Sequence, residues 1–140
     1  MEKSETEVLE ILNNLRKDTL LNTLDIEFIA VGEDFVEARM PVTSKVHQPD
    51  GVLHGGATVA LAETVGSVAS AVFLDSKNFF VRGIEINANH VRSVRDGYVI
   101  ARAEFIHKGR TTQVWDIKIR NEEGKLISAC KLTTIALPKK

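Results

Sequence analysis

An apolar run over residues 56–73 places the strongest constraint on the fold of this 140-residue chain. Its letters, GATVALAETVGSVASAVF, are mostly small or aliphatic and are sufficient for about five turns of helix. Glu63 and several small polar residues interrupt the run, which predicts a buried core helix and not a membrane span. A helix that is apolar on nearly every side must be covered, and a sheet can cover it.

The segments on either side of this helix indicate a single α+β domain over residues 1–140. Residues 4–16 repeat apolar side chains at helical spacing, and Ser4 or Thr6 is available as the N-cap. Residues 24–30 and 36–42 alternate apolar and polar side chains around a turn at 32–34, which predicts a hairpin. Four more strands are expected at about 81–93, 97–107, 111–120 and 125–136, separated by short Gly-containing turns.

Composition excludes several classes of partner and site. The net charge of −1 provides no broad field for nucleic acid or a membrane surface. Cys130 is the single cysteine, so no intramolecular disulfide can form, and its place in an alternating stretch predicts a buried small side chain. The four histidines lack zinc-site spacing, so no metal is expected. No secretion signal is recognisable, and we expect a cytoplasmic protein.

Glu63 raises the main functional question, because it is the one carboxylate in the apolar helix. Ser67 and Ser70 follow it at i+4 and i+7 and therefore share its stripe. Small neighbours such as Gly66 would permit close approach by a backbone or a ligand. The stripe is interpreted either as a solvated face or as a functional site.

The loop before the helix, residues 44–55, provides hydrogen-bond donors that would complement the carboxylate of Glu63. Gly55 and Gly56 leave backbone N–H groups unobstructed at the helix start, where the helix dipole favours an oxyanion. Gln48 and His54 can donate hydrogen bonds to a carbonyl oxygen. Taken singly, the glycine pair is also explained by a turn and His54 by an exposed loop.

Three stretches, LHGGATVALAETVGS, GIEINANHVRS and GRTTQVWDIKI, resemble the hotdog-fold acyl-CoA thioesterases. The resemblance covers nearly the whole chain. It is to the branch that contains the hydroxybenzoyl-CoA and 1,4-dihydroxy-2-naphthoyl-CoA thioesterases and the proofreading thioesterase of aryl carrier proteins. It implies a long helix wrapped by a six-stranded antiparallel sheet, with an N-terminal helix. It also implies that the third strand lies at the far edge beside the sixth, where hairpin connections alone would suggest a meander.

The resemblance further implies roles for individual residues. Glu63 would be the nucleophile or general base, and the Gly55 N–H would bind the thioester oxygen. Gln48 and His54 would polarise or position the carbonyl. Ser67 would position water or the aryl group. His90 would approach the acyl pocket, and the remaining substrate-binding candidates, near the coenzyme A phosphates, are Arg92, Gly109 and Arg110.

These roles predict hydrolysis of acyl-CoA or acyl-carrier-protein thioesters, with an aromatic or otherwise bulky acyl group. Water is the co-substrate, and no cofactor is needed beyond the coenzyme A of the substrate. One alternative is a hotdog enoyl-thioester hydratase or dehydratase that pairs Glu63 with His54 or His90. Another is a non-catalytic module that binds acyl-CoA or a carrier protein.

The spacing of Gly55 and Glu63 predicts a composite site. The two residues are eight positions apart, or about 12 Å along a helix axis, which a Glu side chain cannot span. A two-fold dimer with antiparallel long helices would bring Glu63 of one chain to Gly55 of the other. We therefore expect an obligate homodimer, paired into a tetramer.

Overall fold

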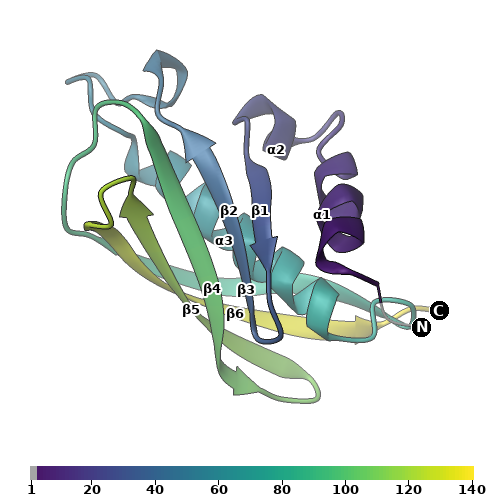
Figure 1. Ribbon diagram of the computed structural model, residues 1–140. Coiled ribbons are helices and arrows are strands. Elements are labelled where there is room, and N and C mark those ends of the chain that lie inside the picture. Colours follow the sequence, from purple (N-terminus) through teal and green to yellow (C-terminus); the bar gives the residue numbers. More distant parts are fainter. Residues whose placement is uncertain (1–2) are drawn as a thin grey trace.

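The computed structural model describes residues 3–140, so residues 1–2 of the expected domain lie outside it. One six-stranded antiparallel sheet curves around one long helix (Figure 1). The predicted element order is confirmed, and two short elements, α2 and a 3-10 turn, were not predicted. The elements are α1 (Glu5–Asn14), α2 (Leu20–Thr23), β1 (Glu27–Val31), β2 (Phe35–Pro41), the 3-10 turn (Ser44–Val46), α3 (Gly55–Phe73), β3 (Phe79–His90), β4 (Tyr98–Lys108), β5 (Thr112–Asn121) and β6 (Leu126–Pro138).

The strand order, β1-β2-β4-β5-β6-β3, confirms the edge position expected for the third strand. After α3 the chain returns along the far edge, where β3 pairs antiparallel with β6 and His90 lies opposite Ser128. β4, β5 and β6 then follow one another through tight turns. The outer edge of the twelve-residue β3 has no strand partner among the described residues.

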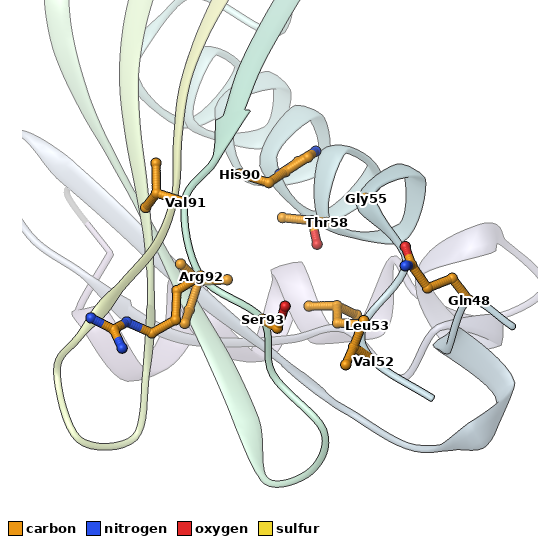
Figure 2. Close-up of a pocket in the computed structure, with 10 residues that line it drawn as sticks. Gln48, Val52, Leu53, Gly55, Thr58, His90, Val91, Arg92 and Ser93 are labelled. Atoms are coloured by element: carbon orange, nitrogen blue, oxygen red, sulfur yellow. The ribbon is translucent and has the colours of Figure 1, made fainter. Parts of the chain in front are cut away.

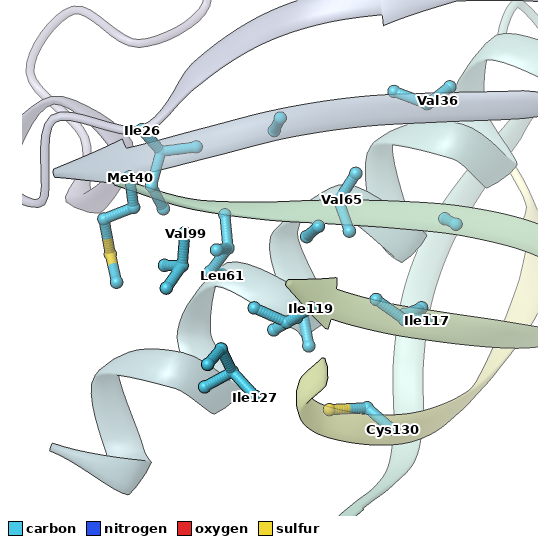
Figure 3. Packing of buried hydrophobic residues seen from close by; sticks show 14 of the residues in the cluster. Ile26, Val36, Met40, Leu61, Val65, Val99, Ile117, Ile119, Ile127 and Cys130 are labelled. Carbon is cyan, nitrogen blue, oxygen red and sulfur yellow. The ribbon is translucent and has the colours of Figure 1, made fainter. Parts of the chain in front are cut away.

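The core lies between α3 and the concave face of the sheet (Figure 3). Leu61 and Val65 of α3 are fully buried, and the inward side chains of β5, such as Ile117 and Ile119, pack opposite them. By length and mean hydropathy, 1.4, α3 would also suit a membrane span, but it packs against β2 to β6. The prediction of a core helix is therefore confirmed.

The N-terminal helix packs on the other edge of the sheet, against β1 (Figure 1). Ser4 and Glu7 form a reciprocal capping box at its start, which satisfies two backbone N–H groups. At its end, the Asn13 side chain both donates to and accepts from the backbone of Phe28, at 3.0 and 2.9 Å. These bonds attach α1 to the free edge of β1.

Candidate active site

His54 ends the loop and caps α3. Its Nδ1 accepts a hydrogen bond of 2.8 Å from the Gly56 N–H. A neutral imidazole that accepts at Nδ1 carries its proton on Nε2, so His54 can still donate from that nitrogen. The Gly55 N–H donates to no described residue. One backbone donor therefore remains available at the positive end of the helix dipole.

The two glycines after His54 each leave space for an imidazole ring. A Cβ on Gly55 would lie 2.9 Å from Nε2 of His90, and a Cβ on Gly56 would lie 2.9 Å from Nδ1 of His54. Contacts below 3 Å are not tolerated, so either Cβ would displace a ring. The HGG sequence is thus explained by the packing of two histidines around one helix start.

A cavity of about 330 Å³ opens beside this helix start, between α3 and the segment after β3 (Figure 2). Five of its ten lining residues are polar or charged and four are aliphatic, so both a polar and an apolar part of a ligand could be contacted. Of the residues predicted for the site, the cavity brings together Gln48, Gly55, His90 and Arg92. Its other lining residues are Val52, Leu53, Thr58, Val91, Ser93 and Ile127.

Two of the predicted residues, Gln48 and His90, are held in place by side-chain hydrogen bonds. Gln48 donates from Nε2 to Asp50 at 2.9 Å, which leaves its carbonyl oxygen and second N–H free for another partner. His90 Nδ1 lies 3.0 Å from the Ser128 hydroxyl, and that hydroxyl donates to the Asn89 carbonyl at 3.2 Å. Ser128 is fully buried, so it fixes the orientation of the His90 ring.

Arg92 lines the cavity, but its guanidinium points away from the cavity in Figure 2. It is exposed, as expected for a group that would meet a charged ligand at the rim. Its predicted contact with the coenzyme A phosphates stays a prediction.

Glu63 lies two turns along α3 from Gly55 and does not line the cavity. Its Oε2 lies over Gly83 of β3, only 2.7 Å from the position that a Cβ there would occupy. Glu63 and Ser67 are both partly exposed. Ser70, which the spacing placed on the same stripe, is instead fully buried beneath the sheet and hydrogen-bonded to Thr134. The stripe therefore ends at Ser67.

Gly109 and Arg110 lie in the turn between β4 and β5, at the other end of the sheet (Figure 1). β6 shows how far this turn is from the cavity. Gln113, next to the turn, pairs with Thr134 of β6, whereas His90 at the cavity pairs with Ser128, six residues earlier on the same strand. Six strand residues correspond to about 20 Å. Within one chain, these two predicted substrate-binding residues are therefore not brought to the cavity.

Sequence reasoning missed several residues that shape the cavity. Thr58 lies one turn after the helix start, and in the sequence it cannot be told from any other small helix residue. In the structure its hydroxyl donates to the His54 carbonyl at 3.2 Å. Ser128 carried a detectable signal, because it is a polar residue at an inward position of the alternating strand LISACKLTTIAL. The aliphatic lining residues gave no signal, because they are typical of any core.

Cys130 is buried, as predicted, and contributes no nucleophile to the cavity. Burial raises the pKa of the Cys130 thiol, and the hydrogen bond between Cys130 and Ser128 offsets part of that increase. Within residues 3–140, no group of three or more His, Cys, Asp or Glu side chains has metal-site geometry.

A family model described as the thioesterase superfamily matches residues 50–128, more than half of the chain. The chain belongs to the thioesterase superfamily. This thioesterase is 46% identical over 129 residues to the 1,4-dihydroxy-2-naphthoyl-CoA hydrolase of Escherichia coli, covering 92% of this chain and 94% of that protein. It is 42% identical over 129 residues to the proofreading thioesterase EntH of Cronobacter turicensis, covering 92% and 93%.

Solved structures agree with this assignment. A mutant thioesterase from Pseudomonas aeruginosa matches this thioesterase with a TM-score of 0.92 and 44% sequence identity, covering 94% of both chains. The predicted hotdog fold and the predicted thioester hydrolase activity are thereby confirmed. The relatives are named as hydrolases and thioesterases, which favours hydrolysis over the hydratase and binding-module alternatives.

Proposed function

We propose that this thioesterase hydrolyses thioesters of coenzyme A or of a carrier protein that bear an aromatic or otherwise bulky acyl group. The observation that carries the proposal is the Gly55 N–H, which donates to no described residue and adjoins a cavity of about 330 Å³ with both polar and aliphatic lining residues. The four aliphatic side chains of its lining, Val52, Leu53, Val91 and Ile127, would pack against an apolar acyl group. The relatives named for a naphthoyl-CoA substrate and for proofreading support this substrate class.

The proposed reaction begins with the thioester oxygen at the Gly55 N–H. As a general base, Glu63 removes a proton from water, the hydroxide attacks the carbonyl carbon, and the oxyanion is stabilised at Gly55. The C–S bond then breaks, the acid and the thiolate of the carrier are released, and the proton on Glu63 passes to the thiolate or to water, which restores the carboxylate. As a nucleophile, Glu63 would instead form an acyl anhydride that water hydrolyses afterwards. In either case, thiolate is a good leaving group and needs little acid assistance.

The proposed site combines residues of two chains. Glu63 is about 12 Å along the helix axis from Gly55, and its carboxylate rests on Gly83 at the open edge of the sheet. That edge exposes Phe80 at 46% and Ile84 at 56%, although both side chains are large and apolar. Pairing of two β3 edges would cover such side chains and bring Glu63 toward the partner's cavity. We propose a homodimer, with a dimer of dimers as the larger assembly.

A screen for thiol release tests the substrate class. Aromatic, short-chain and medium-chain coenzyme A esters, and one aryl carrier-protein thioester, are compared at equal concentration. Aromatic esters should be turned over at least ten times faster than acetyl-CoA. Equal rates on all esters would overturn the aromatic assignment, while leaving thioester hydrolysis intact.

Replacement of Glu63 tests its role. Glu63→Ala should lower turnover at least 100-fold while the protein stays folded, because the attacking group is lost and the oxyanion donor remains. Glu10→Gln, an exposed carboxylate on α1, is the matched control and should have wild-type turnover. Thermal unfolding of both variants checks the fold, and near-normal turnover by folded Glu63→Ala would remove Glu63 from the mechanism.

A further inference from the structure

His90 lines the cavity, and its two ring nitrogens have different surroundings. Nδ1 lies 3.0 Å from the hydroxyl of Ser128 on β6. Nε2 has no hydrogen-bond partner among the described residues and lies 2.9 Å from the position that a Cβ on Gly55 would occupy. Figure 2 shows the ring reaching from the end of β3 toward α3. One nitrogen is thus bonded within the protein, and the other faces the helix start where the thioester oxygen is proposed to bind.

The hydroxyl of Ser128 has one proton, and its neighbours decide where that proton goes. The Asn89 carbonyl, 3.2 Å away, can only accept, so Ser128 donates to it. The Sγ atom of Cys130 lies 3.4 Å from the same hydroxyl, and because burial raises the pKa of this thiol, it keeps its proton and donates to Ser128. The hydroxyl has no second proton to give, so Nδ1 of His90 must also donate to Ser128.

These bonds assign the tautomer of the neutral His90 ring. An imidazole that carries its proton on Nδ1 has a lone pair and no proton on Nε2. The other tautomer would turn the lone pair of Nδ1 toward an oxygen that has no proton left for it. Ser128 is fully buried, so water cannot take its place beside Nδ1. Ser128 therefore fixes Nε2 of His90 as a hydrogen-bond acceptor at the cavity.

The two histidines at the helix start present opposite groups. His54 accepts from the Gly56 N–H at Nδ1, so its Nε2 carries a proton and can donate. His90 donates at Nδ1, so its Nε2 can only accept. A carbonyl oxygen can use the Gly55 N–H and the His54 donor, but it cannot use the acceptor of His90. That acceptor is available to a proton-bearing group of the ligand that lies beside the thioester carbonyl.

We propose that His90 is a specificity-determining residue whose Nε2 accepts a hydrogen bond from a hydroxyl group next to the thioester carbonyl of the acyl group, and that Ser128 positions it for this contact. This inference rests on the proposed function, in which aryl thioesters are substrates. On an aromatic acyl group the position next to the carbonyl is the ortho position. A methoxy group there cannot donate, and a para-hydroxyl group points away from the carbonyl.

Four coenzyme A esters test the contact: ortho-hydroxybenzoyl, ortho-methoxybenzoyl, para-hydroxybenzoyl and para-methoxybenzoyl. The measured quantity is kcat/KM for the hydroxy ester divided by kcat/KM for the methoxy ester, at each ring position. All four esters share the same thiol, and the comparison of variant with wild type cancels their intrinsic reactivities. A variant that loses the proposed hydrogen bond should lower the ortho ratio alone.

His90→Phe removes both ring nitrogens, and Ser128→Ala removes the hydroxyl that fixes the tautomer. Each should lower the ortho ratio about fivefold, as expected for one neutral hydrogen bond, and leave the para ratio within twofold of wild type. Ser128→Ala should cause no further fall in the His90→Phe background, because Ser128 acts through His90. Ser128→Thr is the matched control, since it keeps the hydroxyl and should keep the ortho ratio. Thermal unfolding checks that each variant folds.

Nitrogen-15 NMR of the wild-type protein tests the tautomer without any substrate, and does not depend on the folding of the Ser128 variants. The His90 signals are identified by their loss in His90→Phe. In alkaline buffer, where the imidazole is neutral, they should show the proton on Nδ1. Ser128→Ala should move this proton to Nε2, wholly or in part. A wild-type ring with its proton on Nε2 would overturn the inference.

The kinetic outcomes separate this inference from the proposed function. An ortho ratio that is unchanged in folded His90→Phe, or an equal fall for the hydroxy and methoxy esters, would overturn the inference and leave hydrolysis of aryl thioesters intact. An equal fall would mean that the ring contacts the thiol arm or has only a structural role. If the wild type hydrolyses none of the four esters, the proposed function fails, and the inference fails with it.

Discussion

The groups around the start of α3 that could hydrogen-bond the thioester oxygen are expected to differ in their effect on turnover. The Gly55 N–H is a backbone group, so no side-chain substitution in the loop removes it. Gln48 and His54 add side-chain donors, of which His54 also caps the helix through its Nδ1. A substitution of His54 therefore has two effects, one on the carbonyl and one on the helix, which experiments must separate.

Gln48→Ala and His54→Ala should each reduce turnover less than Glu63→Ala does, because the Gly55 N–H remains. Loss of one such donor corresponds to about 3 kcal/mol at most in the activation free energy. His54→Asn is the control for the cap, since Asn is a good N-cap residue and should keep the unfolding temperature close to wild type. Steady-state kinetics decide the order of the effects, and a larger loss for either loop variant than for Glu63→Ala would make His54 the candidate base.

Cys130 should make folding stability dependent on pH above neutrality. Burial raises the pKa of this thiol, so the unfolded chain releases the thiol proton at a lower pH than the folded chain does. This contribution to stability is complete below an unfolded pKa of about 8.5 and is lost as pH rises through the higher folded pKa. Unfolding temperatures from pH 7 to pH 10 should fall more steeply for wild type than for Cys130→Ala, and parallel curves would contradict this explanation.

The elements α3 and β3 run side by side, and their contact determines where the carboxylate of Glu63 can lie. Gly83 makes room for this carboxylate, because the Oε2 atom of Glu63 occupies the space that a side chain at position 83 would fill. β3 contributes only its inner face to the core and is otherwise exposed. β3 therefore supports the site as well as completing the sheet through its long pairing with β6.

Gly83→Ala should separate stability from activity. The added Cβ would meet the flexible end of Glu63 at 2.7 Å, so the carboxylate moves while the strand tolerates the change. Alanine also restricts the unfolded chain more than glycine does, so the unfolding temperature should stay the same or rise. Turnover should fall about tenfold or more, consistent with displacement of a catalytic group by about 1 Å. Wild-type turnover would contradict the proposed place of Glu63 in the reaction.

At the scale of the whole molecule, one chain presents the two halves of the proposed site in different places. The cavity is at the start of α3, whereas Glu63 is on the side of α3 that faces the open β3 edge. The β4–β5 turn with Arg110 lies at the far end of the sheet. The proposed homodimer would bring these groups together.

Mixed dimers test this arrangement directly. Glu63→Ala and His54→Ala chains are unfolded together and refolded, so that a shared-site heterodimer contains one doubly altered site and one wild-type site. With random pairing, about a quarter of the sites are wild type, and activity should exceed that of either variant alone. Each variant refolded separately and then mixed is the control. Light scattering must show dimers, and activity equal to the average of the two variants would mean that each chain holds its own site.

The sequence alone determined the elements of this protein, because local patterns report local structure. The apolar run at 56–73 could only be a covered helix, and the alternating segments after it became β3 to β6 with ends shifted by three residues at most. The helix-start residues Gly55 and His54 were also identifiable, because capping and free N–H groups are properties of neighbours in sequence.

The tertiary structure alone decided which distant residues meet. Sequence spacing placed Ser70 beside Glu63, but the helix turned its hydroxyl into the sheet, where Thr134 and Trp115 satisfy it. The cavity depends on Thr58 of α3, Ser93 of the segment after β3 and Ile127 of β6, which follow no common sequence pattern. Periodicity shows which face of an element is buried, whereas the contacts made by that face depend on how helix and strands cross, and only the folded chain sets that geometry.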